Sequence, residues 1–332
     1  RHPPSRICSV SYQTVSRLLL VKVSVRQQVC TFNNLAGDFS LRRNQLRSPI
    51  RHLCFLKYLN LVCKMKTKLS IVVPCYEEAL NIKPLCTRVF KATRAAKPKI
   101  DAELLLVDDY SGKGTEDTKK VVEALQKEDY NIKIIVRMPE EGKGLSSAVL
   151  LGLEKAEHDV MLVMDADLQH EPETVPALAA PVLKGEAEFS VGSRNVAGGE
   201  VKDWPLKRRL ISFVATALAY PLTSISDPMS GFFCISRQVL ERGKGSLNPM
   251  GYKIGLELAV RCKCTNVVEV PITFRDREAG ESKLTAKQNL LYLVHLAHLY
   301  WFLYPVTICF LFIVGLLILY FSIIFLQEFL EI

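Results

Sequence analysis

The chain has 332 residues and a formal net charge of +9, so it is long enough to bury a sizeable core. The charge is uneven, because residues 1–64 contain 11 Lys and Arg but only one acidic residue, Asp38. The rest of the chain is close to neutral, which argues against a nucleic-acid-binding protein. The ten cysteines have neither disulfide-framework nor zinc-site spacing, and they suit a reducing, cytosolic environment.

Residues 1–64 show no sustained helical or strand periodicity. They also lack the charged start, long apolar run and cleavage site of a signal peptide. Their composition, rich in Arg and Ser and poor in acids, leaves an organelle transit peptide open. We favour a disordered extension or translated upstream sequence, because the first methionine is Met65. We therefore expect the catalytic domain to occupy residues 65–283.

Beyond Met65, short apolar runs alternate with segments of helical spacing. Strands are predicted at 69–73, 103–107, 132–136, 160–164 and 187–191. Helices are predicted at 78–96, 115–129 and 145–156, and after Pro172. Strands that alternate with helices form βαβ units, so the sequence predicts an α/β fold with a mostly parallel, Rossmann-like sheet.

The C-terminal part of the chain is strongly apolar. Residues 299–326 contain no charged residue, and this run of 28 exceeds the roughly 20 residues that a membrane-spanning helix needs. We predict a transmembrane segment at 303–326 and an amphipathic, interfacial segment at 284–302, which includes His295 and His298. Pro305 leaves a single span and a hairpin of two short spans open.

The flanking charges give this segment an orientation. Lys283 and Lys287 precede it, whereas only Glu328 and Glu331 are charged after it. Because positive residues stay on the cytosolic side, we expect a cytosolic catalytic domain with a C-terminal anchor.

Polar clusters follow four of the predicted strands, at residues 74–78, 108–111, 165–169 and 192–194. In parallel α/β sheets, ligands bind beyond the carboxyl ends of the strands, so these clusters are expected to form one site. The dinucleotide motif GxGxxG is absent after the first strand, and the Walker motif GxxxxGK[ST] is incomplete.

Asp165, Asp167 and Gln169 supply an oxygen at every second residue, so an extended segment would direct all three to one side. Such hard oxygen ligands suit Mg²⁺ or Mn²⁺. A divalent ion bound to a diphosphate would neutralise a departing nucleotide. We therefore predict that these residues bind a metal ion, with a solvated loop as the alternative. His170 is expected to be a hydrogen-bonding neighbour instead of a ligand.

The segments IVVPCYEE, LLVDDYSGKGT, EEGKG, MDADLQH and VGSR, in this order, resemble family-2 glycosyltransferases with the GT-A nucleotide-sugar fold. DWPLKRRLIS, SDPMSGFF, EVPITF and DREAGESKL narrow the resemblance to the dolichyl-phosphate mannosyltransferases, over residues 67–287. The apolar C-terminus is similar to the self-anchored members, which work without separate membrane subunits. The resemblance implies inverting, metal-dependent transfer of mannose from GDP-mannose to dolichyl phosphate at the endoplasmic reticulum membrane. The product would supply protein glycosylation and GPI-anchor pathways.

The resemblance also implies a role for each matching residue. Donor binding is implied for Pro74, Tyr76, Glu78, Val107, Asp109, Asp165 and Lys283. Binding of the acceptor phosphate is implied for Arg194, Arg208, Ser212 and Arg277. Catalytic roles are implied for Asp167, Arg194 and Arg208. Arg209 could replace Arg208, and Asp108 could replace Asp109, because each is next to a residue of the same type.

The chemistry of the acceptor agrees with this reading. A phosphate monoester has its second pKa near 6, so the nucleophile is already mostly ionised at about pH 7 and requires no general base. We expect Asp227 and Glu257 to position other groups. The segment WPLKRRLIS has an alternative role as the basic start of an amphipathic helix near anionic lipid.

Two other functions remain open at this point. One is a polyprenyl-phosphate glycosyltransferase that uses another donor, such as UDP-glucose. The other is an inactive membrane scaffold that retains the fold. A processive polysaccharide synthase would carry a QxxRW motif, which this sequence lacks.

Overall fold

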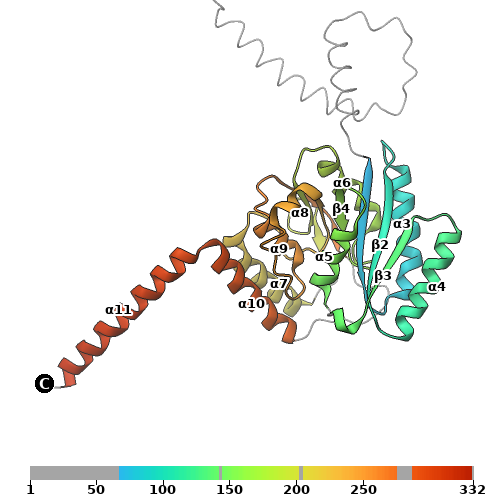
Figure 1. The fold of residues 1–332 in the computed structure, drawn as a ribbon. Helices are drawn as coiled ribbons and strands as arrows, with labels where there is room; N and C mark the ends of the chain where they lie inside the picture. The colour runs from blue at the N-terminus through green and yellow to red at the C-terminus, as the bar shows by residue number, and fades with distance from the viewer. Residues whose placement is uncertain (1–66, 142–143, 202–204, 275–285, 331–332) are drawn as a thin grey trace, which may run out of the picture. The chain divides into compact units, whose positions relative to one another are not determined.

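A computed structural model of the chain describes residues 67–141, 144–201, 205–274 and 286–330 (Figure 1). The predictions for residues 1–64 lie outside the described residues. From Lys68 onwards, strands and helices alternate along the chain, which confirms the predicted α/β class.

Seven strands form one mixed, mostly parallel sheet in the order β3-β2-β1-β4-β7-β5-β8. Their bounds are β1 (Lys68–Cys75), β2 (Asp101–Asp109), β3 (Ile132–Arg137), β4 (Val160–Val163), β5 (Phe189–Ser193), β7 (Phe233–Ser236) and β8 (Val267–Pro271). The five predicted strands are confirmed. β7 runs antiparallel to its neighbours β4 and β5. Two short strands, β6 (Glu200–Val201) and β9 (Thr273–Phe274), form a separate parallel pair.

Side chains of the sheet alternate between two hydrophobic cores, one on each face. In β1, Leu69, Ile71 and Val73 belong to one core and Val72 belongs to the other. This alternation follows from the two-residue period of a strand. The first core includes residues of α3 (Ala79–Ala95), α4 (Lys113–Lys127) and α6 (Val175–Leu183). The second includes residues of α5 (Leu145–Lys155), α8 (Arg237–Gly243) and α9 (Ile254–Arg261), so helices cover both faces (Figure 1).

A third cluster joins the helix that follows the catalytic domain, α10 (Ala286–Leu303), to that domain. It consists of Met229 and of apolar residues from α9, from α10, and from α7 (Leu206–Ala219) with the adjoining 3-10 turn η4 (Tyr220–Leu222). Two other 3-10 turns, η2 (Pro139–Glu141) and η3 (Pro172–Thr174), precede α5 and α6.

Helix α10 has one buried and one exposed face. Tyr292, His295, Leu296 and Leu299 are buried, whereas Leu290, Leu293, Val294 and Trp301 are exposed. The expectation that His295 lies at a membrane interface is wrong, because this side chain packs inside the protein. The interfacial assignment of residues 284–302 as a whole stays a prediction, and its first two residues lie outside the described residues.

Helix α11 (Pro305–Leu330) is long and apolar enough to cross a membrane over Pro305–Leu326, where its mean hydropathy is 3.0. None of this window is buried against the protein. Pro305 is the first residue of the helix, where its missing N–H costs no hydrogen bond. The described residues after Tyr304 therefore form a single helix instead of a hairpin.

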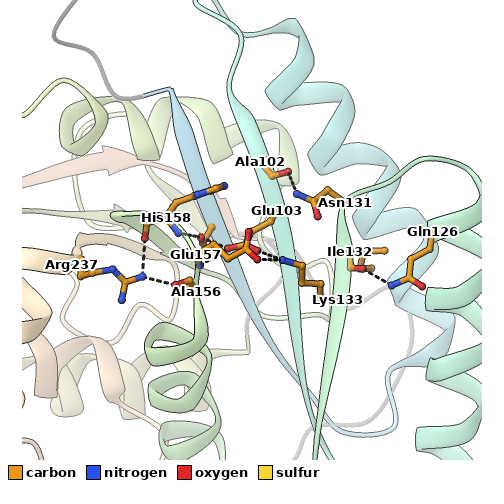
Figure 2. Close-up of polar contacts among 11 residues, drawn as sticks. Ala102, Glu103, Gln126, Asn131, Ile132, Lys133, Ala156, Glu157, His158 and Arg237 are labelled. Atoms are coloured by element: carbon orange, nitrogen blue, oxygen red, sulfur yellow. Dashed lines mark hydrogen bonds and ion pairs between the residues drawn. The ribbon is translucent and has the colours of Figure 1, made fainter.

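A polar cluster ties the amino-terminal parts of β1, β2 and β3 together (Figure 2). The buried carboxylate of Glu103 in β2 accepts hydrogen bonds from the Ser70 hydroxyl, the Glu157 backbone N–H and the Lys133 ammonium. Burial alone would raise the pKa of Glu103, but these hydrogen bonds outweigh it and hold the pKa below its ordinary value. Arg237 donates to the carbonyls of Ala156 and His158 beside this cluster. These contacts lie away from the carboxyl ends of the strands, where the candidate site is found.

Candidate functional site

A cavity of about 440 Å³ lies at the carboxyl ends of β1, β2, β4 and β5. Ten of the residues singled out from the sequence line it: Pro74, Tyr76, Glu78, Asp109, Asp165, Asp167, Gln169, Arg194, Arg208 and Ser212. The strand-end clusters therefore converge as the parallel topology predicts. Arg277 and Lys283 lie outside the described residues.

The loop after β1 forms one wall of the cavity. Its residue Glu77 has a φ of 58°, a left-handed conformation that a non-glycine residue adopts at a small energetic cost. The next residue, Glu78, immediately precedes α3 as its N-cap residue, and its carboxylate accepts a hydrogen bond of 2.8 Å from the Asn81 amide. Tyr76 is exposed at the cavity. An aromatic ring can stack on the face of a planar base, and a fixed carboxylate beside it can accept hydrogen bonds from the polar edge of the base.

Of the neighbouring residues Asp108 and Asp109, Asp109 is the one that lines the cavity. Its Oδ1 accepts a hydrogen bond of 2.7 Å from Nε of Arg137, and its Oδ2 accepts one of 2.9 Å from the Gly144 N–H. Asp108 is fully buried, accepts a 2.6 Å hydrogen bond from the Thr115 hydroxyl and does not line the cavity. Burial raises the pKa of Asp108.

The side chain of Val107 does not line the cavity. It is fully buried in the core on the α5 side of the sheet. A Cβ placed on Gly152 would lie 3.0 Å from Cγ2 of Val107, which shows how closely α5 packs on β2. A role for Val107 in donor binding is therefore confined to its backbone.

The predicted metal ligands approach one another through a turn. β4 ends at Val163, and Leu168 has a φ of 59°, so the expectation of an extended segment over residues 165–169 is wrong. The turn nevertheless leaves Asp165, Asp167 and Gln169 in the cavity wall. The N–H of Gln169 donates to Oδ1 of Asp167 at 3.2 Å, which stabilises the turn. Leu168 thus combines a left-handed backbone conformation with a buried side chain. Such local backbone strain is of the kind found at functional sites.

The donor set fits a hard divalent ion. Two carboxylates and one amide are oxygen ligands of the type that Mg²⁺ and Mn²⁺ prefer. In the described ranges, no three His, Cys, Asp or Glu side chains are grouped closely enough to hold a metal ion by themselves. Mg²⁺ commonly takes its remaining ligands from substrate phosphates and water, so this incomplete protein set suits an ion bound together with a diphosphate.

Arg194 is fixed by the buried carboxylate of Asp227. Its Nε and Nη2 donate to the two carboxylate oxygens at 2.7 Å each, and its backbone N–H donates to Oδ2 at 3.0 Å. Burial alone would raise the pKa of Asp227, but the Arg194 guanidinium outweighs this effect and holds the pKa below its usual range. The guanidinium also lies 5.2 Å from the centre of the Phe274 ring. Asp227 is thus engaged in positioning Arg194.

Helix α7 brings Arg208 and Ser212 to the cavity one turn apart, as their spacing predicts. Arg209 is exposed and does not line the cavity, so Arg208 is the better placed of the two.

Two residues that line the cavity differ from the sequence predictions. Lys253 was given no role, and His170 was given a different one. Lys253 is half-buried, and its Nζ donates to the Met229 carbonyl at 2.8 Å. Burial, reinforced by Arg194, lowers the pKa of Lys253 to about 8. The sequence signal is a single lysine before the apolar helix α9, which does not distinguish a cavity residue from a surface one.

His170 is buried between two aromatic rings, with centroid distances of 5.0 Å to Phe232 and 5.2 Å to Phe274. Burial lowers its pKa to about 3, so the imidazole is neutral. Its Nδ1 has no hydrogen-bond partner among the described residues. The expected hydrogen-bonding role therefore finds no support at this nitrogen.

Comparisons with known proteins agree with this architecture. The model of glycosyl transferase family 2 matches residues 70–243. A dolichol-phosphate mannosyltransferase of Mycosarcoma maydis is 44% identical, over 75% of this chain and 85% of that protein. One of Saccharomyces cerevisiae is 43% identical, over 77% of this chain and 96% of that protein.

Among solved structures, a mannosyltransferase of Pyrobaculum calidifontis in complex with GDP-Man and Mn²⁺ is similar over 70% of this chain and 65% of that chain. It is 16% identical with a TM-score of 0.43, a distant likeness that does not bear on the ligands of this chain. The family match and the two closely related sequences do bear on identity, since each covers more than half of the chain. This chain belongs to the dolichol-phosphate mannosyltransferases of glycosyl transferase family 2.

Proposed function

We propose that the chain transfers mannose from GDP-mannose to dolichyl phosphate with inversion at the anomeric carbon. The observation that carries the proposal is the convergence of ten family-matching residues on one cavity at the sheet edge. The high identity to dolichol-phosphate mannosyltransferases over most of the chain supports the same donor and acceptor.

The donor would bind along the carboxyl ends of β1, β2 and β4. Tyr76, Glu78 and Asp109 would hold the nucleoside, and Asp165, Asp167 and Gln169 would hold a Mg²⁺ or Mn²⁺ ion beside the diphosphate. When bound, such an ion stabilises the negative charge of the departing GDP. Arg277 and Lys283, in the segment DREAGESKL, would contact phosphate groups.

The acceptor phosphate would bind at Arg194, Arg208 and Ser212. Guanidinium groups bind phosphate through paired N–H donors, which favours arginine at this position. A phosphate oxygen forms the new bond to the anomeric carbon while the bond to GDP breaks. Because this oxygen is already mostly ionised at about pH 7, no side chain needs to remove a proton. The engagement of Asp227 with Arg194 agrees with a positioning role instead of a basic one.

The membrane would hold the acceptor close to this cavity. Exposed apolar residues of α7, including Leu206, Leu210 and Phe213, and of α10, including Leu290 and Leu293, suit the surface of a lipid bilayer. Helix α11 would anchor the chain without accessory subunits. The proposed location is the endoplasmic reticulum membrane, with the catalytic domain in the cytosol.

The deciding experiment is a donor panel. Full-length chain in vesicles that contain dolichyl phosphate is given labelled GDP-mannose, GDP-glucose or UDP-glucose, and the labelled lipid product is measured. We expect product from GDP-mannose alone. Efficient transfer from UDP-glucose would favour the alternative polyprenyl-phosphate glycosyltransferase, and no transfer from any donor would favour the inactive scaffold.

A further inference from the structure

Helix α10 is joined to the catalytic domain by a buried hydrogen bond that the proposed reaction does not use. His295 is 2% exposed, and its Nε2 lies 2.7 Å from Oε2 of Glu257 in α9. A carboxylate can only accept, so His295 donates through Nε2. The bond links a helix that continues towards the membrane segment to a helix whose first residue, Ile254, lines the cavity.

Glu257 is the centre of this contact. Its other oxygen, Oε1, accepts a 2.6 Å hydrogen bond from the Asn248 N–H and lies 2.7 Å from Nε of Arg261. Glu257 is 1% exposed, so its carboxylate is shielded from water. Each of these partners replaces a hydrogen bond that water would otherwise provide. The engagement of both oxygens agrees with the expectation that Glu257 positions other groups.

Tyrosines of α10 provide a second attachment, this time to α7. The hydroxyl of Tyr292 donates to the Ala215 carbonyl at 2.7 Å, and that of Tyr300 donates to the Leu218 carbonyl at 2.9 Å. Helix α10 is thus held on one side by α7 and on the other by α9. All three helices contribute to the cavity wall.

The amino-terminal turn of α10 is the part that reaches the cavity, through Gln288 and Asn289. Gln288 precedes His295 by seven residues, which is two helical turns and therefore the same face. A displacement of α10 at His295 would be transmitted along this rigid helix to Gln288. That wall of the cavity also includes Arg208 and Ser212, the proposed acceptor side.

We propose that His295 is a positioning residue for the acceptor. Its hydrogen bond to Glu257 fixes α10 so that Gln288 and Asn289 complete the wall around the lipid phosphate. The described donor-side residues of the cavity lie at the strand ends, on elements other than α9 and α10. The inference rests on the proposed function, since it assigns the acceptor to this wall.

The test compares steady-state constants for the two substrates in the full-length protein. His295→Leu removes the donor and is expected to raise KM for dolichyl phosphate about tenfold, because without this bond only about a tenth of the molecules would hold α10 in the acceptor-binding position. KM for GDP-mannose is expected to stay within about twofold, because the described donor-side residues lie on other elements of the fold. His295→Gln offers an amide donor and should return KM for dolichyl phosphate to within about threefold of wild type.

His298→Leu is the matched control, because His298 lies on the same helix and accepts a 3.2 Å hydrogen bond from the Asn248 amide without contacting Glu257. It should leave both constants unchanged. If His295→Leu does not fold, Glu257→Gln is measured instead, with the same split expected. Unchanged KM for dolichyl phosphate, an equal rise in both constants, no rescue by Gln, or an equal effect of His298→Leu would each overturn the inference. Dissociation constants for GDP and dolichyl phosphate, measured on the same preparations, keep the test independent of turnover. If the wild-type protein binds both but transfers no mannose, only the proposed function is overturned.

Discussion

The ion pair between Arg194 and Asp227 leads to a specific prediction about the stability of the folded protein. Asp227→Asn preserves the size of a fully buried side chain but removes its charge and replaces one of the two oxygens that accept from Arg194. The guanidinium, 9% exposed, would remain as a buried cation without an opposing charge. The half-buried ammonium of Lys253 adds further repulsion, since Arg194 contributes to the lowering of the pKa of Lys253.

Removing one partner of a buried ion pair costs about 3–5 kcal/mol. Asparagine retains one acceptor, so we expect the lower end, about 3 kcal/mol. In a domain of this size, 1 kcal/mol shifts Tm by about 2–4 °C, and Tm should fall by about 6–12 °C. The folded-state pKa of Asp227 is depressed, so its contribution is complete above the unfolded-state pKa and is lost as pH falls through the folded-state pKa. The difference between wild type and variant should therefore be constant near neutral pH and shrink only in acid, below about pH 4.

Thermal unfolding of the full-length chain in detergent measures the effect, with exposed Asp101→Asn as the matched control. Arg194→Leu should cost about as much as Asp227→Asn, because it leaves the carboxylate unpaired. The double variant Arg194→Leu/Asp227→Asn should be more stable than either single variant, since it leaves neither member of the pair charged. A loss below about 1 kcal/mol for Asp227→Asn, or additive losses in the double variant, would refute this reasoning.

Three further predictions concern the core, the polar cluster and the membrane face. Gly152→Ala should cost about 1–3 kcal/mol by overpacking, because the new Cβ would lie 2.3 Å from Val72 and 3.0 Å from Val107. Glu103→Gln should lower the free energy of unfolding by about 2 kcal/mol at neutral pH, and the difference should vanish as pH falls through the depressed pKa of Glu103. Phe213→Asp should raise KM for dolichyl phosphate in vesicles, because an exposed apolar residue of α7 would become charged at the lipid surface.

Each of these has a matched control. Gly245→Ala, at a glycine with open space around it, should be close to neutral in chemical unfolding. Exposed Glu123→Gln should show no comparable pH dependence in the same unfolding series. Phe213→Leu should keep wild-type KM in vesicles. Equal effects in variant and control would contradict the corresponding prediction.

The sheet and the location of the site could be predicted because their signals are local. Apolar runs such as 69–73 specify buried strands, and the parallel order places every strand end on one edge. The antiparallel strand β7 has no such signal, because its direction depends on the path of the chain between β5 and β8. The turn at Leu168 was missed for a related reason: alternating oxygen ligands fit a strand and a turn equally well.

Burial of polar side chains could not be predicted from the sequence. His295 occurs in an apolar run next to a membrane segment, where an interfacial position is the simpler expectation, yet its partner Glu257 is 38 residues away. Lys253 and the engagement of Asp109 with Arg137 likewise depend on contacts between distant segments. Val107 illustrates the converse, since a motif position can belong to the core and contribute only its backbone.

The central claim is that the oxygen ligands at the end of β4 make mannosyl transfer possible at this cavity. The most direct test is the transfer of labelled mannose from GDP-mannose to dolichyl phosphate by the full-length chain and by Asp167→Asn, with and without a chelator. We expect Asp167→Asn to retain the wild-type Tm within a few degrees but to lose transfer by at least about 100-fold, with chelated wild type equally inactive and restored by Mg²⁺ or Mn²⁺. Undiminished transfer by Asp167→Asn, or by wild type in chelator, would contradict the account.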